Sequence, residues 1–213
     1  MSDVRPTYVT AAQLAAALLA APAVAANWGR PSALPEFSVG GLAGHLAAQV
    51  FNVTLALGAE APAGSPVVSL PEHYARADWL AAPLDQATNV LIRRGGENAA
   101  ANGPVALHTE ACTELHRLRD VLPAEPADRT VFLPWAGWSL TLDDLLLTRL
   151  MEIAVHCDDL AASVGEPTPQ LPDAVLHPVL TLLTDLSVRR HGQLAVLRAL
   201  SRSERAPATI SAL

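Results

Sequence analysis

The chain has 213 residues, of which 51% are hydrophobic and 16% charged, so it can bury a sizeable core and is not a disordered protein. Its formal net charge of −7 argues against a basic face for nucleic acid. The apolar residues are mostly Ala, Leu and Val, and the first two favour helices. Two cysteines, Cys112 and Cys157, are too few for a disulfide framework, and we expect reduced thiols in a cytoplasmic protein.

The first predicted helix spans residues 10–21, with Thr10 as its N-cap. The apolar stretch 11–26 also shares features with a signal peptide, but Gln13 and Pro22 interrupt it. We therefore expect an amphipathic helix of the folded protein. No run of 18 apolar residues occurs, so we expect no membrane span.

A second helix is predicted to begin after the N-cap Ser38 and to reach Val53. Its apolar residues recur every three or four positions and form one stripe that faces the core. His45 lies on that stripe. Such a histidine is either a core residue with its hydrogen bonds satisfied or a functional group.

The middle of the chain predicts more helix and little strand. Its elements are a helical stretch over 73–100 interrupted at Pro83, a helix over 105–122 that starts after Gly103-Pro104, and a strand-like piece at 131–133.

The last bundle helix has the clearest boundaries. Thr141 and Asp144 form a start that resembles a capping box, and Gly165 is a stop. A Pro-rich segment then leads into an Arg-rich tail that predicts one or two helices over 173–202. We therefore expect a helical bundle over 1–165, with a Pro-rich linker and Arg-rich helical tail over 166–213 packed on or beside it.

Glu152 and His156 are four residues apart on this helix, so both project from one face and can share a metal ion. The spacing alone does not select them. Two other pairs have the same spacing: Asp173 with His177, and Cys112 with His116.

The surroundings favour Glu152 and His156, which lie in the most apolar segment of the chain. A carboxylate buried there is costly unless it is paired or bound to metal. The alternative for Glu152 is a salt bridge to Arg149, one turn earlier. His45 is the natural third ligand, and three protein ligands leave coordination positions open, as in catalytic sites.

Two regions resemble the metal-ligand regions of the mycothiol-dependent maleylpyruvate isomerase family, which belongs to the DinB-like superfamily. The first comprises NWGRPS at 27–32 and FSVGGLAGHL at 37–46, and the second is TRLMEIAVHCDDLA at 148–161. The order and separation of the two regions fit, and the resemblance covers about residues 8 to 165.

The resemblance implies an all-α, DinB-like four-helix bundle, here with a short C-terminal helical extension. It implies zinc, or another divalent metal, on His45, Glu152 and His156. Family members use mycothiol or a related low-molecular-weight thiol in isomerisation or S-transfer. The sequence departs from the family in the region before His45, where Gly40, Gly41 and Gly44 replace larger residues.

A second departure concerns the C-terminal part, because the isomerase proper has a C-terminal domain that supplies a catalytic Arg, and this chain is shorter after Pro172. Arg189, Arg190 or Arg198 in the tail could clamp a carboxylate, and we take Arg190 and Arg198 as the catalytic candidates. The alternative is a solvated basic helix.

The implied chemistry begins with a thiol that zinc deprotonates. The thiolate adds to an electrophilic double bond, rotation follows and the thiolate leaves, or it stays as an S-conjugate. Neither cysteine of the chain is expected to be the nucleophile. Arg149 and Asp159 lie three residues from a ligand and are expected to support the site.

Two other functions stay open: a non-catalytic metal-binding protein with a binding or regulatory role, and a hydrolase with zinc-bound hydroxide. The hydrolase lacks a His-Glu-x-x-His motif to supply its general base. The partners we expect are a small-molecule thiol and an electrophilic substrate, without nucleic acid or membrane. The protein is expected to be a monomer or a homodimer.

Overall fold

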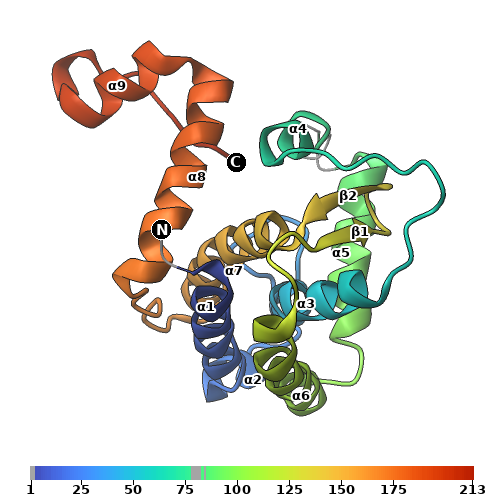
Figure 1. Ribbon diagram of the computed structural model, residues 1–213. Coiled ribbons are helices and arrows are strands. Elements are labelled where there is room, and N and C mark those ends of the chain that lie inside the picture. Colours follow the sequence, from blue (N-terminus) through green and yellow to red (C-terminus); the bar gives the residue numbers. More distant parts are fainter. Residues whose placement is uncertain (1–2, 78–82, 84) are drawn as a thin grey trace.

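The computed structural model describes residues 3–77, 83 and 85–213 (Figure 1). Its helices are α1 Val4–Leu19, α2 Pro22–Ala26, α3 Val39–Gly58, α4 Leu70–Ala75, α5 Ala87–Ala99, α6 Pro104–Val121, α7 Leu142–Val164, α8 Asp173–His191 and α9 Gln193–Ser201. Two short 3-10 turns, Leu122–Ala124 and Ser203–Arg205, follow α6 and α9. Strands β1 Thr130–Leu133 and β2 Trp138–Thr141 form an antiparallel hairpin.

Four long helices, α1, α3, α6 and α7, pack against one another, and α5 packs along α3 (Figure 1). Their apolar stripes meet in one core, in which Leu42, Leu46, Leu145 and Leu146 are fully buried. The predominantly helical fold expected from the sequence is confirmed. Because α3 and α7 share the centre of this core, side chains that face inward from these two helices lie close together.

The predicted start of the first helix is wrong, because α1 begins at Val4. Asp3 is the N-cap and accepts a hydrogen bond from the backbone N–H of Arg5 at 3.1 Å. Pro6 lies in the first turn, where its missing N–H costs nothing. Thr10 is inside the helix, and its hydroxyl donates to the carbonyl of Pro6.

The stretch predicted over 73–100 forms two helices, since α4 ends at Ala75 and α5 begins at Ala87. The interruption predicted at Pro83 falls between them, and residues 78–82 and 84 lie outside the described residues. The strand predicted at 131–133 is confirmed as β1. The sequence pattern does not predict its partner β2, which a turn ending at Gly137 brings back along β1.

Helix α7 has the boundaries that the sequence predicts. The hydroxyl of Thr141 accepts from the backbone N–H of Asp144 at 3.1 Å, and Gly165 ends the helix with φ of 73°. This left-handed conformation favours glycine. Glu152 and His156 therefore lie well inside a long, capped helix.

The glycines before His45 allow helix α5 to approach α3 closely. A Cβ atom on Gly44 would overlap the carbonyl oxygen of Gly96, and one on Gly96 would overlap that of Gly41. A Cβ on Gly40 would overlap the ring of Trp28, which precedes α3. The small residues that depart from the family pattern thus have a packing role.

The tail forms two helices, α8 and α9, which separate at Gly192 with φ of 83°. Helix α8 packs on α7 and α1, and its buried residues Val175, Val179 and Leu182 belong to the main core. Figure 1 shows α9 at the far end of this arm. The division into parts at residue 165 stays a prediction.

By length and composition, helix α3 is apolar enough to cross a membrane, although the sequence has no unbroken run of 18 apolar residues. Of its most apolar window, 67% is buried inside the protein, and the helix packs against α1, α5, α6 and α7. It is therefore the central core helix of the bundle.

Candidate metal centre

Two helices bring the three predicted ligands together. His45 comes from α3, and Glu152 and His156 come from one face of α7. The Nε2 atoms of the two histidines are 3.2 Å apart, and Oε2 of Glu152 lies 3.0 Å from Nε2 of His156 and 3.9 Å from Nε2 of His45. In the part of the chain that the structure describes, this is the one group of three His, Cys, Asp or Glu residues with converging ligand atoms.

The hydrogen bonds of His156 direct a lone pair into this group. Its Nδ1 donates to Oδ2 of Asp159 at 2.9 Å, so Asp159 supports the ring as the sequence predicts. In a neutral ring Nε2 is then an acceptor, and it faces two other acceptors, Nε2 of His45 and Oε2 of Glu152. Three converging acceptors need a cation or a proton among them, and this donor set suits zinc.

Burial and hydrogen bonding set the charges of the group. Burial lowers the pKa of His156, but hydrogen bonds to Asp159 and Glu152 outweigh it and raise the pKa to about 9. Burial raises the pKa of Glu152, but the hydrogen bond from His156 and the nearby imidazole of His45 hold that pKa well below its ordinary value. Burial lowers the pKa of His45. Without metal at neutral pH, the proton on His156 therefore supplies the positive charge that a metal ion would replace.

Arg149 supports the site through Gln49 rather than by contact with a ligand side chain. Its Nη1 donates to Oε1 of Gln49 at 2.7 Å, and Nε2 of Gln49 donates to the backbone carbonyl of His45 at 2.8 Å. Its Nε donates to the hydroxyl of Thr148. The alternative of a salt bridge between Arg149 and Glu152 is therefore wrong, although the charge of Arg149 helps to lower the pKa of Glu152.

The group lies just below the surface of the protein. The exposed fractions of the His45, Glu152 and His156 side chains are 18%, 10% and 14%. The ring of Phe37 packs against that of His45, with 5.8 Å between centroids. The three side chains are therefore largely shielded from water, and that of His45 is the most exposed of them.

Residues 9–161 match the family described as mycothiol maleylpyruvate isomerase N-terminal domain. This match spans more than half of the chain and includes the three converging residues. The chain belongs to this family. No curated protein and no solved structure matches the chain at a significant level.

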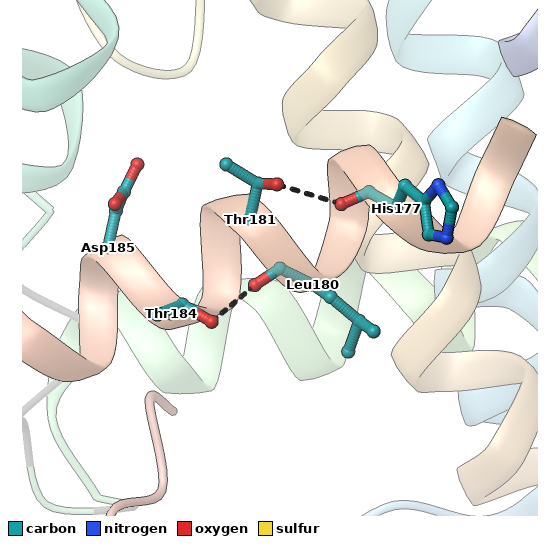
Figure 2. Close-up of a pocket in the computed structure, with 5 residues that line it drawn as sticks. All are labelled: His177, Leu180, Thr181, Thr184 and Asp185. Atoms are coloured by element: carbon teal, nitrogen blue, oxygen red, sulfur yellow. Dashed lines mark hydrogen bonds between the residues drawn. The ribbon is translucent and has the colours of Figure 1, made fainter. Parts of the chain in front are cut away.

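The first of the competing pairs, Asp173 with His177, does not form part of such a group. Figure 2 shows His177 on α8 at a shallow hollow that also includes Leu180, Thr181, Thr184 and Asp185. The two threonine hydroxyls donate to the carbonyls of His177 and Leu180, at 2.9 and 2.7 Å. Within residues 3–77, 83 and 85–213, no third ligand joins His177.

The second competing pair is Cys112 with His116. The partner that the structure gives Cys112 is instead His108, whose Nε2 lies 3.3 Å from Sγ of Cys112. Both cysteines are free thiols. Burial raises the pKa of Cys157 to about 12, so its thiol stays protonated at neutral pH. Cys112 lies on α6, which contributes none of the three converging residues.

The two arginines proposed as catalytic lie on the surface of the tail. Arg190 is exposed near the end of α8, and Arg198 is exposed on α9. The structure shows no hydrogen bond or ion pair from either to the three converging residues among the described residues. Nη1 of their neighbour Arg189 donates to the carbonyl of Pro71 at 2.9 Å, so this end of α8 reaches α4.

Sequence reasoning missed the contribution of helix α4. Burial, and next the charge of Arg149, lower the pKa of His73 to about 4. Burial, and next the charge of Glu152, raise the pKa of Tyr74 above its ordinary value. The two residues are therefore electrostatic neighbours of the family's metal-ligand region. No spacing in the sequence connects them to Glu152, and only the tertiary fold does.

Proposed function

We propose that the protein is a zinc-dependent enzyme that uses mycothiol, or a related low-molecular-weight thiol, to isomerise a small electrophilic substrate or to form its S-conjugate. The observation that carries this proposal is the convergence of three metal-binding atoms, from His45, Glu152 and His156, in a member of this family. Three protein ligands leave coordination positions for a further ligand, as catalytic zinc sites do.

Zinc bound there would supply one chemical effect, which is to lower the pKa of a thiol so that the thiolate is present at neutral pH. The chain itself would hold and orient the ligands. Asp159 fixes the ring of His156 so that Nε2 faces the site, and Gln49 holds the backbone of His45. The low exposure of these side chains limits access of water to the reacting groups.

The nucleophile in this proposal comes from outside the chain. The thiol of Cys157 is buried and protonated, and Cys112 lies on a helix without a ligand of the site. Arg190 and Arg198 remain the proposed partners for a substrate carboxylate, since a guanidinium binds a carboxylate through two parallel hydrogen bonds. The contact between Arg189 and α4 supports this role for Arg190, because it brings the end of α8 to the helix whose Tyr74 is within electrostatic range of Glu152.

Metal content is the first test. Elemental analysis of the purified protein should give about one zinc per chain. The His156→Ala variant should lose it, and the His177→Ala variant should keep it, because His177 lies on α8 without a third ligand among the described residues. Equal zinc content in the wild type and His156→Ala would refute the site.

Thiol dependence is the second test. Zinc-loaded protein would be assayed with mycothiol and maleylpyruvate, and then with other electrophilic acids and epoxides. Turnover should require both zinc and thiol, and should persist in His177→Ala. Zinc binding without any thiol-dependent turnover would support a non-catalytic metal-binding role instead, and turnover of an ester or amide without thiol would support a hydrolase.

A further inference from the structure

Helix α4 is short, but contacts from other elements fix its position beside the hairpin that leads into α7. Just before α4, the backbone N–H of Val68 donates to the carbonyl of Ser139 at 2.9 Å. Within α4, Nδ1 of His73 accepts from the indole N–H of Trp138 at 3.1 Å, and the carbonyl of Pro71 accepts from Nη1 of Arg189 at 2.9 Å. Ser139 and Trp138 belong to β2, so α4 is anchored to the strand that immediately precedes α7, the helix that carries Glu152.

Tyr74 on α4 has a hydroxyl group that is buried without a partner. The residue is only 4% exposed. In the described part of the chain, its hydroxyl is the one buried side-chain oxygen or nitrogen that makes no hydrogen bond. A buried unpaired hydroxyl destabilises a protein, so its presence needs an explanation.

Charged residues of α7 act on the phenol of Tyr74. The negative charge of Glu152 and the positive charge of Arg149 both act on it, so the phenol lies within electrostatic range of these two residues of α7. Burial and Glu152 raise its pKa, and the group is therefore a neutral donor at physiological pH. The ring of His73 packs against it edge-on, with 5.0 Å between centroids.

We propose that the Tyr74 hydroxyl donates a hydrogen bond to an anionic group of the ligand that binds at the metal centre, either a thiolate sulfur or a carboxylate oxygen. This inference rests on the proposed function. It explains why a donor is kept buried and unpaired within range of the charge of Glu152: its partner arrives with the ligand. Tyr74 is then a binding residue, placed by α4.

The test compares Tyr74→Phe with the wild type in three measurements. Zinc affinity should be unchanged. The affinity of the zinc-loaded protein for mycothiol, which has a thiol and no carboxylate, or for maleate, which has carboxylates and no thiol, should fall about 10- to 100-fold. The melting temperature of the metal-free protein should stay equal or rise, because phenylalanine removes an unpaired buried hydroxyl.

Tyr8→Phe is the matched control. Tyr8 is also fully buried and also senses the charge of Arg149, but its hydroxyl donates to the carbonyl of Gln49 at 3.1 Å. Its loss should lower the melting temperature and leave both ligand affinities within about twofold of the wild type. A loss with mycothiol alone assigns the thiolate, and a loss with maleate alone assigns the carboxylate.

Two results would overturn the inference while the proposed function stands. One is unchanged affinity of Tyr74→Phe for both probes, as expected if the hydroxyl binds only a buried water. The other is a lower melting temperature of metal-free Tyr74→Phe, which would show that the hydroxyl is already bonded within the fold. If the wild type binds no zinc, the proposed function fails and the inference fails with it.

Discussion

Zinc binding should release a proton from His156, and the amount follows from the structure. Hydrogen bonds to Asp159 and Glu152 raise the pKa of His156 in the metal-free protein to about 9 despite its burial. At pH 6 nearly every metal-free molecule therefore carries this proton, and coordination through Nε2 must displace it. His45 has a lowered pKa and Glu152 a strongly lowered one, so neither adds much to the release.

The sign and size of the pH effect follow directly. Only the form without the proton on Nε2 binds metal, so zinc affinity rises with pH until the pKa of about 9 is reached. Below that pKa the affinity should change about tenfold per pH unit, and at pH 6 it should be roughly 1,000-fold weaker than its limit. A zinc titration at pH 6 is useful because water bound to zinc keeps its protons at this pH, so any proton released comes from the protein.

The assay is calorimetric titration of metal-free protein with zinc at pH 6, in two buffers with different heats of ionisation. The difference in apparent enthalpy gives the number of protons released, and we expect about one per zinc. A second titration at pH 7 should show about tenfold tighter binding. Release near zero, together with equal affinity at the two pH values, would refute the assignment of an imidazolium to His156 in the metal-free site.

Three further predictions concern the support of the site, the nucleophile and the packing of the bundle. Asp159→Asn should weaken zinc binding about 10- to 100-fold, and an unchanged dissociation constant would exclude its supporting role. The double variant Cys112→Ser, Cys157→Ser should keep its zinc and most thiol-dependent turnover, and lost turnover with zinc retained would point to an internal nucleophile. Gly44→Ala should lower the free energy of unfolding in urea by about 1–3 kcal/mol, because its Cβ would overlap α5. The control Gly58→Ala, where no atom lies within 4 Å of the new Cβ, should be neutral or stabilising.

Local signals in the sequence account for much of the fold. The cap at Thr141 and the glycine at 165 delimit α7 because these residues satisfy the backbone at a helix end without help from the rest of the chain. The start of α1 was harder to predict, since both Asp3 and Thr10 can cap a helix. The hydrophobic contacts of α1 with α6 and α7 extend along the helix to Tyr8 and beyond, so they favour the longer form.

The candidate site was also predictable in part from local sequence signals. Glu152 and His156 share a helix face because four residues make about one turn, so their spacing alone predicts this. His45 is a candidate third ligand because it lies on an apolar helix stripe, and the family resemblance implies the same residue. The spacing did not distinguish this pair from Asp173 with His177. The apolar surroundings favour Glu152 and His156, and the structure agrees, because it adds His45 from α3, 111 residues before His156.

The residues that surround His45, Glu152 and His156 cannot be read from the sequence, because they come together only in the folded chain. Gln49 links Arg149 to the backbone of His45, and α4 brings Tyr74 within electrostatic range of Glu152. Gln49 and His45 are one helical turn apart, but the contact between Gln49 and Arg149 joins residues 100 positions apart, and no helical period or capping motif encodes it. Such contacts depend on how closely helices approach and on which buried polar groups then find partners, and both are properties of the packed chain.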